Sequence, residues 1–293
     1  MTSLSIVKQS IYRFSPGLYS RAYQLYSASF YARMRRAKIE HDVARKLEKR
    51  LRYEAEAIRR YFGDDWAVRH GPFAGMKYPP RVVSGSLLSP KIIGSYESPL
   101  HRWIEEAVAA KYQAIVNIGC AEGYYSVGLA RRCGEAQIYA YDIDERARAN
   151  SLSLARLNGV NERIHIGGTC TIEELNLRVV GRALVFCDIE GGELDLLRPD
   201  LVPGLTNTDL IVETHDDHRP GLTQTLLGRF RQSHRAELVY HCAKSAREFP
   251  VLARVPASEH ALLLEEGRPR DQCWIRLVAN PADAIEPTEW WSA

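Results

Sequence analysis

One segment restricts the fold of this chain more than any other. Residues 115–125 read Ile-Val-Asn-Ile-Gly-Cys-Ala-Glu-Gly-Tyr-Tyr, which is an apolar strand, a turn of small residues and the start of a helix. Small residues at Gly119, Ala121 and Gly123 let the backbone approach a ligand closely. The start of the helix adds free N–H groups and a positive dipole end. In a doubly wound α/β sheet, such a turn lies at the crevice where ligands bind.

Apolar strands alternate with helical stretches from residue 100 onward, which predicts a parallel sheet covered on both faces. We expect strands at Ala114–Ile118, Gln137–Tyr141, Arg163–Ile166, Ala183–Cys187 and Asp209–Glu213. We expect helices near Tyr124–Arg132, Glu145–Asn158, Thr171–Leu175 and Glu193–Leu197. Two later runs resemble strands without a clear helix between them and fit an antiparallel pair at one edge of the sheet: Ala236–Cys242 and Cys273–Ala279.

The charge of the chain is distributed unevenly. Residues 1–62 hold 14 Lys/Arg and 5 Asp/Glu, a balance of +9, and the remaining residues hold 25 and 31, a balance of −6. Residues Tyr31–Phe62 contain no Gly or Pro and predict one long helix with an apolar stripe; before it, Tyr19, Tyr23, Tyr26 and Phe30 share a helical face. We therefore expect a basic helical extension over 1–62, a loop and short-strand linker over 63–99, and the α/β domain over 100–293.

The basic extension permits several partners. A second copy of the chain can cover the stripe of the Tyr31–Phe62 helix, which suggests a homodimer. Nucleic acid and a membrane surface are less favoured, because such stripes are more often packing faces and the body is acidic.

Composition narrows the class of protein. With 45% hydrophobic and 26% charged residues, the chain is not a disordered polymer, a collagen or a small disulfide scaffold. We expect no transmembrane helix and no signal peptide. The six cysteines form no C-x-x-C pair and are expected to be reduced thiols of a cytoplasmic protein.

Carboxylates follow the second and fourth predicted strands. Asp142 ends the second strand about 20 residues after the glycine turn, where a carboxylate can accept both hydroxyls of a ribose. Asp144 precedes a helix and is assigned to its N-cap. Asp188, Glu190 and Glu193 follow the fourth strand at the same edge of the sheet. We assign a functional role to Asp188 and a helix-capping role to Glu193.

The fifth predicted strand ends in Glu213-Thr214-His215-Asp216. His215 can act as a general base near pH 7. Carboxylates also suit Mg²⁺ or Mn²⁺, so Asp188, Glu213 and Asp216 would be the ligands if a divalent metal were bound. We do not predict a metal, because dense carboxylates alone fix no coordination geometry.

Together, these motifs resemble class I S-adenosylmethionine-dependent methyltransferases of the FkbM-like group. The resemblance is carried by the turn Asn117–Tyr125, the strand end Ala140-Tyr141-Asp142 and the segment Asp188-Ile189-Glu190-Gly191-Gly192-Glu193-Leu194, which is similar to the D-x-E-G-x-E stretch typical of the group. The segment Gly94–Glu97 is similar to the Y-E segment that precedes the first strand there. A dinucleotide fingerprint fits less well, because Tyr124 follows the G-x-A-x-G turn.

The resemblance implies a Rossmann-like sheet of about seven strands, S-adenosylmethionine as the cofactor, and O-methylation of a small molecule, sugar, lipid or peptide hydroxyl or carboxyl. For catalysis our hypothesis is that His215 takes the proton of the acceptor as the base, and that Asp188 orients His215 or the acceptor. The resemblance also implies a set of cofactor-binding residues: Tyr96, Glu97, Asn117, Gly119, Cys120, Ala121, Gly123, Tyr124, Tyr125, Asp142, Ile143, Thr169, Cys170 and Asp188.

Two other functions stay open at this point. An RNA methyltransferase could grip phosphates through the basic extension. A protein with the cofactor fold but no catalysis could use the extension for assembly. The first predicts RNA binding that weakens with salt, and the second predicts an oligomer without methyl-transfer activity.

Overall fold

A computed structural model describes residues 30–80, 86–268 and 271–281. The aromatic face at Tyr19, Tyr23 and Tyr26 lies outside these residues. The chain divides into two compact units, of which one ends at Tyr53 and the other begins at Glu54. None of the helices in the described ranges has the length and apolar character needed to cross a bilayer.

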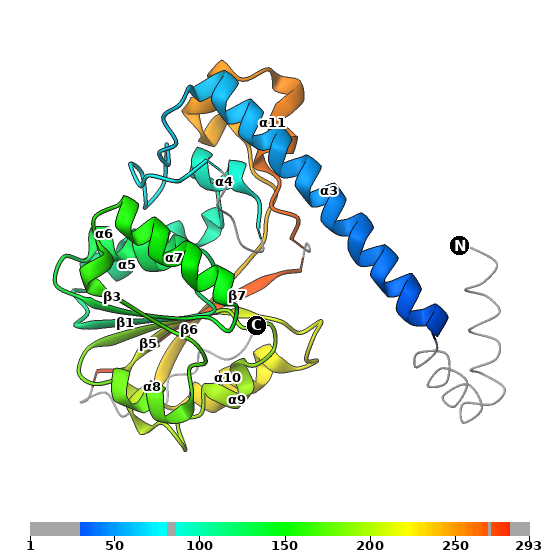
Figure 1. The fold of residues 1–293 in the computed structure, drawn as a ribbon. Coiled ribbons are helices and arrows are strands. Elements are labelled where there is room, and N and C mark those ends of the chain that lie inside the picture. Colours follow the sequence, from blue (N-terminus) through cyan, green and yellow to red (C-terminus); the bar gives the residue numbers. More distant parts are fainter. Residues whose placement is uncertain (1–29, 81–85, 269–270, 282–293) are drawn as a thin grey trace. The chain divides into compact units, whose positions relative to one another are not determined.

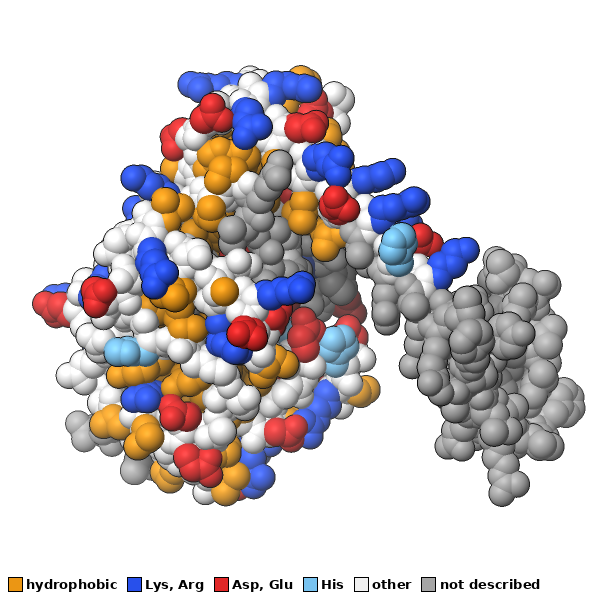
Figure 2. Space-filling view, viewed as in Figure 1, with side chains coloured by type: hydrophobic (Ala, Val, Ile, Leu, Met, Phe, Trp, Pro, Cys, Tyr) orange, Lys and Arg blue, Asp and Glu red, His pale blue; other side chains and the backbone are white. Residues whose placement is uncertain are grey.

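Helix α3 (Phe30–Phe62) confirms the predicted long helix. It ends at Gly63, whose φ of 76° is in the left-handed region and whose N–H donates to Arg59 O at 3.0 Å. Figure 2 shows blue Lys and Arg side chains along the helix. The exposed basic residues of the helix include Lys38, Arg45, Lys46, Lys49, Arg52, Arg59 and Arg60. The final turns belong to the second unit, where Ile58 is buried.

The segment after α3 consists of turns and loops over residues 63–80 and also contains a helix that was not predicted. Its described residues contain one isolated bridge, Ala67 to Lys77, and the helix α4 (Leu88–Ile93). The carboxylate of Glu54 accepts the N–H groups of Leu88 at 2.8 Å and Ser89 at 3.2 Å. These bonds satisfy two of the N–H donors that a helix leaves unpaired at its start. The local sequence does not reveal this contact between Glu54 and α4.

The second unit contains a seven-stranded sheet of order β3-β2-β1-β4-β5-β7-β6 (Figure 1). The first five strands in sequence pair in parallel, and β7 joins β5 and β6 antiparallel. This confirms the predicted doubly wound α/β sheet and its antiparallel edge. The strands are β1 (Ala114–Ile118), β2 (Gln137–Tyr141), β3 (Ile164–Gly167), β4 (Ala183–Cys187), β5 (Asp209–Thr214), β6 (His234–Tyr240) and β7 (Cys273–Ala279).

Helices cover both faces of the sheet (Figure 1). One face carries α5 (His101–Ala109), α6 (Tyr124–Arg132) and α7 (Glu145–Leu157), and the other carries α8 (Ile172–Arg178), α9 (Glu193–Leu196) and α10 (Leu222–Phe230). Two buried apolar clusters fill the layers, one with Trp103, Leu129 and Leu154, the other with Leu175 and Leu226. Every residue of β1 and β4 is buried, so these strands form the centre of the sheet.

The connection between β6 and β7 contains helices that the sequence analysis did not predict. They are η4 (Ala246–Glu248), η5 (Pro250–Arg254) and α11 (Ala257–Leu264). Helix α11 packs against α4, where Ser89 Oγ donates to Leu263 O at 2.9 Å. This packing anchors the end of the connection, which carries Glu266 and Arg268 to the ligand cavity.

Candidate functional site

A cavity of about 610 Å³ lies at the carboxyl ends of the parallel strands. All of the predicted cofactor and catalytic residues line it except Gly123. Gly123 instead begins α6 in the left-handed conformation, and a Cβ there would lie 2.7 Å from Ser151 Oγ. Its small size therefore serves the packing of α6 on α7.

The turn after β1 requires glycine at its first position. Gly119 has a φ of 78°, and a Cβ would lie only 1.7 Å from the carbonyl oxygen of Asp188. The N–H groups of Gly119 and Cys120 donate to Tyr141 O at 2.8 and 2.9 Å. Backbone contacts thus hold the ends of β1, β2 and β4 together, and they leave no room for a side chain at Gly119.

Asp142 connects this turn to the end of β2. Its two carboxylate oxygens accept the N–H groups of Ala121 and Asp144, each at 2.8 Å. Asp144 caps α7 through the N–H of Arg146, as predicted. Each oxygen of Asp142 keeps acceptor capacity for a further donor. Beside it, the apolar side chain of Ile143 is 83% exposed and lines the cavity.

The predicted Tyr96-Glu97 pair also lines the cavity. Glu97 is buried and has a φ of 46°, a strained conformation for a residue with a side chain. Its carboxylate accepts hydrogen bonds from Tyr125 Oη and from Arg268. The ring of Tyr125 stacks on Phe186, with the ring centroids 4.0 Å apart. Several elements of the fold therefore converge on Glu97.

Three further predicted cofactor residues line the cavity with different surroundings. Asn117 is buried, and its Oδ1 accepts the hydroxyl proton of Ser126 at 2.7 Å. Thr169 is exposed and Cys170 is buried after β3. The six cysteines are unpaired thiols, and Cys242 is the exposed one.

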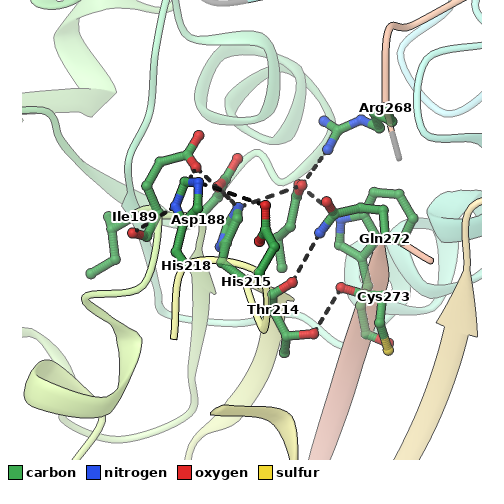
Figure 3. A network of polar contacts seen from close by, with 12 residues as sticks. Asp188, Ile189, Thr214, His215, His218, Arg268, Gln272 and Cys273 are labelled. Carbon is green, nitrogen blue, oxygen red and sulfur yellow. Dashed lines mark hydrogen bonds and ion pairs between the residues drawn. The ribbon is translucent and has the colours of Figure 1, made fainter. Parts of the chain in front are cut away.

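Charged side chains gather where β4 and β5 end (Figure 3). His215 Nδ1 lies 3.0 Å from Glu193 Oε1. Its Nε2 lies 3.5 Å from Asp188 Oδ1, 3.6 Å from Glu190 Oε2 and 3.7 Å from Glu213 Oε1. The structure thus brings together Asp188 and His215, as the sequence predicted.

Arg268 supplies positive charge to the same cluster. Figure 3 shows its guanidinium pointing from the segment before β7 toward the carboxylates. It bonds to Glu213, Glu97 and the Tyr96 hydroxyl, the last at 2.9 Å. Its guanidinium carbon also lies 5.2 Å from the centroid of the Trp274 ring, a cation–π distance.

The environment changes the acidity of these groups. Burial raises the pKa of Asp188 to about 7, and the charge of Glu97 adds to this effect. Burial also raises the pKa of Glu213 to about 9, with a contribution from Asp188. Burial lowers the pKa of His215, but the hydrogen bond with Glu193 and the charge of Asp188 outweigh it, so the pKa rises to about 9. At neutral pH, His215 is therefore a cation.

The arrangement alters the set of residues that could hold a metal. Ligand atoms of Asp188, Glu213 and His215 lie within 4.8 Å of one another. Asp216, which the sequence analysis grouped with them, instead accepts hydrogen bonds from Thr223 N and Oγ1 at the start of α10. The guanidinium of Arg268 bonds to Glu213 Oε1, so the carboxylates already have a cation beside them.

Sequence reasoning missed two buried charged groups of the cavity. Arg268 and Glu266 belong to a segment without a recognisable motif. Lys91, 1% exposed, pairs with Glu122, and Tyr78 Oη donates to the same carboxylate at 2.9 Å. A lysine within the apolar run of α4 is the only local sign of this pair, because buried lysines are rare unless they are partnered.

Comparisons with known proteins give similar folds at low identity. No protein family profile matches the chain, and no curated protein matches it. It is similar to the O-methyltransferase TomG of Streptomyces achromogenes, solved with SAM, at 14% identity over 79% of this chain and 90% of that one (TM-score 0.43). It is also similar to an O-methyltransferase of Bacillus cereus solved with SAH, at 13% identity over 59% of this chain and 77% of that one (TM-score 0.43).

An rRNA methylase of Streptococcus thermophilus is similar at 14% identity over 62% of this chain and 96% of that chain (TM-score 0.42). These neighbours differ in their named activities. The sheet order and the helix layers on both faces define a Rossmann-like, doubly wound α/β fold.

Proposed function

We propose that this protein is an S-adenosylmethionine-dependent methyltransferase that acts on a hydroxyl group of a small molecule. The observation that carries the proposal is a single cavity lined by two sets of residues. The first set, which we call the cofactor end, is the glycine turn with Asp142, and the second, which we call the reaction end, is Asp188 with His215. A methyl transferase needs this combination, because its cofactor and its acceptor must meet in line.

The residues of the cofactor end suit a nucleoside. Asp142 offers two oxygens in a fixed orientation to the ribose hydroxyls. The exposed side chain of Ile143 offers an apolar surface to the face of adenine. The turn residues Gly119, Cys120 and Ala121 line the cavity next to Asp142 and offer their backbone to the methionine part. When bound, S-adenosylmethionine supplies a methyl group on a sulfonium sulfur, which is already activated for transfer.

The reaction end suits proton removal from the acceptor. Asp188 lines the cavity with 33% of its side chain exposed, whereas the side chain of His215 is 5% exposed and lies against Glu193. The sequence analysis gave the role of base to His215 and an orienting role to Asp188. We propose the reverse. Asp188 takes the hydroxyl proton as the acceptor oxygen bonds to the methyl carbon and the carbon–sulfur bond breaks.

The FkbM-like assignment is the finer part of this proposal. It is supported by the position of the Asp188–Leu194 segment, whose first residue reaches the cavity and whose Glu193 contacts His215. The acceptor classes that it implies are small molecules, sugars, lipids and peptides. The cavity lining favours acceptors without negative charge, because it holds eight carboxylates: Glu97, Glu122, Asp142, Asp188, Glu190, Glu213, Asp217 and Glu266.

Calorimetric titration of the purified full chain tests the proposal. We expect S-adenosylhomocysteine to bind and NAD not to bind. Asp142→Ala should weaken binding about tenfold or more, equivalent to about 1.4 kcal/mol, because the ribose loses its acceptor. Asp144→Ala is the matched control, since its carboxylate caps α7 and does not line the cavity. A folded protein that binds NAD, or neither molecule, contradicts the proposal.

A further inference from the structure

His215 is held by carboxylates on both sides of its ring. On one side, Nδ1 lies 3.0 Å from Glu193 Oε1. On the other side, Nε2 faces oxygens of Asp188, Glu190 and Glu213 at 3.5 to 3.7 Å. The shorter contact is with Glu193, and a carboxylate oxygen can only accept there. Nδ1 therefore carries the proton in this contact, and Nε2 is the nitrogen that faces the cavity cluster.

The predicted helix-capping role of Glu193 is wrong, because Gly192 is the N-cap of α9 and no side chain caps that helix. The side chain of Glu193 is fully buried, although it is the first residue of α9. Oε1 accepts the N–H of Ile189 at 3.0 Å as well as the proton of His215 Nδ1. Oε2 is buried without a hydrogen-bond partner among the described residues. Burying a carboxylate in this way costs free energy. The contact with His215 offsets part of this cost and suggests that Glu193 has a role in the site.

We propose that Glu193 is a positioning residue for the methyl transfer proposed above. By accepting the Nδ1 proton, Glu193 fixes the ring of His215 so that Nε2 points to Asp188. His215 in turn holds the Asp188 carboxylate toward the acceptor. The inference rests on the proposed function, because the role of Asp188 belongs to it. Carboxylate–histidine pairs orient histidines in many sites in this way.

Several charged groups act on His215 at once. Asp188 extends from the end of β4, Glu190 from the following loop, Glu193 from α9 and Glu213 from β5. The ring of His218 stacks beside it at 5.7 Å between centroids, and Arg268 offsets the charge of Glu213. Of the four carboxylates, Glu193 alone contacts Nδ1. Its removal should therefore change the ring in a manner that loss of the others does not.

Nitrogen-15 NMR of the histidine side chains in the full chain tests the proposal without an acceptor. In the unaltered protein, we expect His215 to keep its Nδ1 proton through the titration. In Glu193→Gln, we expect its pKa to fall by about one unit or more, because a charged acceptor is replaced by a neutral one. If the unaltered protein shows the Nε2-protonated neutral tautomer, the proposal is overturned without recourse to any variant.

Activity supplies a second measurement. Once an acceptor is in hand, Glu193→Gln should lower kcat about tenfold to a hundredfold, shift the pH profile, and leave S-adenosylhomocysteine affinity within about twofold. Glu193→Asp should recover part of the loss. Asp195→Asn is the matched control, since this α9 carboxylate is exposed and pairs with Arg219 outside the cavity. An unchanged kcat and pH profile in Glu193→Gln would overturn the inference.

The two proposals fail in different ways. If S-adenosylhomocysteine does not bind while NMR shows the expected Nδ1 proton, the proposed function is contradicted. The contact of Glu193 with His215 then has a structural role only. If S-adenosylhomocysteine binds but the tautomer or the pKa of His215 does not depend on Glu193, the function stands and the positioning role falls.

Discussion

The two ends of the cavity are built by different means. The cofactor end consists mainly of backbone N–H groups and small residues, and two backbone N–H groups donate to the carboxylate of Asp142. At the reaction end, side chains from four separate segments meet: Glu97, Asp188, the pair Glu213 and His215, and Arg268. The first end is a local feature of strand, turn and helix, and the second exists only in the folded chain.

The difference also concerns charge. A carboxylate that accepts backbone N–H bonds needs no opposite charge beside it. The reaction end instead gathers several acidic side chains, and Arg268 and a protonated His215 lie among them. We therefore expect substitutions at the reaction end to act through charge balance, and substitutions at the cofactor end to act through space and backbone geometry.

The largest expected effect is that of Arg268→Met. Loss of the guanidinium leaves the buried carboxylates of Glu97 and Glu213 uncompensated, and should lower the free energy of unfolding by about 4 kcal/mol. Chemical denaturation measures the change. Arg219→Met is the matched control, since its pair with Asp195 is exposed and should contribute about 1 kcal/mol or less. Adding Glu213→Gln to Arg268→Met should recover part of the loss, and equal effects of the two arginines would refute the charge-balance view.

Gly119→Ala should be the next largest. The added Cβ would meet the carbonyl oxygen of Asp188 at 1.7 Å, in a backbone conformation unfavourable for alanine. We expect a loss of about 3 kcal/mol in the free energy of unfolding, together with loss of S-adenosylhomocysteine binding. Gly134→Ala is the control, because nothing lies within 4 Å of a Cβ there. Thermal melting compares the two variants, and a similar melting temperature for both would show that the turn can relax.

The pH dependence of methyl transfer separates the two candidate bases. If Asp188 is the base, it must be ionised to act, so kcat/KM should rise with pH up to about 7 and then level off. The rise should approach about tenfold per pH unit below that point. Asp188→Asn should lower the plateau about a hundredfold or more and remove the step. A step near 9 that vanishes in His215→Gln would return the role of base to His215.

The smallest expected effect concerns a buried histidine outside the cavity. His234 is held by Thr208 O, and burial lowers its pKa below the ordinary 6.5. The folded state thus resists protonation of His234. The free energy of unfolding should therefore keep its full value above pH 6.5 and decrease below it, by up to about 1.4 kcal/mol per pH unit. Comparing the unfolding free energy of the unaltered chain and His234→Gln at pH 5 and 7.5 measures this. His165→Gln, at an exposed histidine, should leave the pH dependence unchanged.

The sequence predicted the sheet closely because its signals are local. Four of the seven strands, β1, β2, β4 and β7, have the expected bounds, since an apolar run between turns specifies a buried strand. The linker was predicted less completely. Its Pro, Gly and Ser residues suggested loops and short strands, and the structure adds helix α4, whose first N–H groups donate to Glu54. That contact joins residues 34 positions apart, beyond the reach of a pattern search.

The amino-acid sequence alone determined the doubly wound sheet, the glycine turn after β1, and the placement of Asp142 and Asp188 at strand ends. Each depends on hydrophobic periodicity or on a backbone conformation that few residues adopt. Only the tertiary structure decided that Arg268, 171 positions from Glu97, would neutralise it, and that Glu193 would hold His215 instead of ending its role at a helix cap. No residue spacing in the sequence reveals such contacts. They form because burying an unpaired charge costs free energy, and burial is a property of the folded chain.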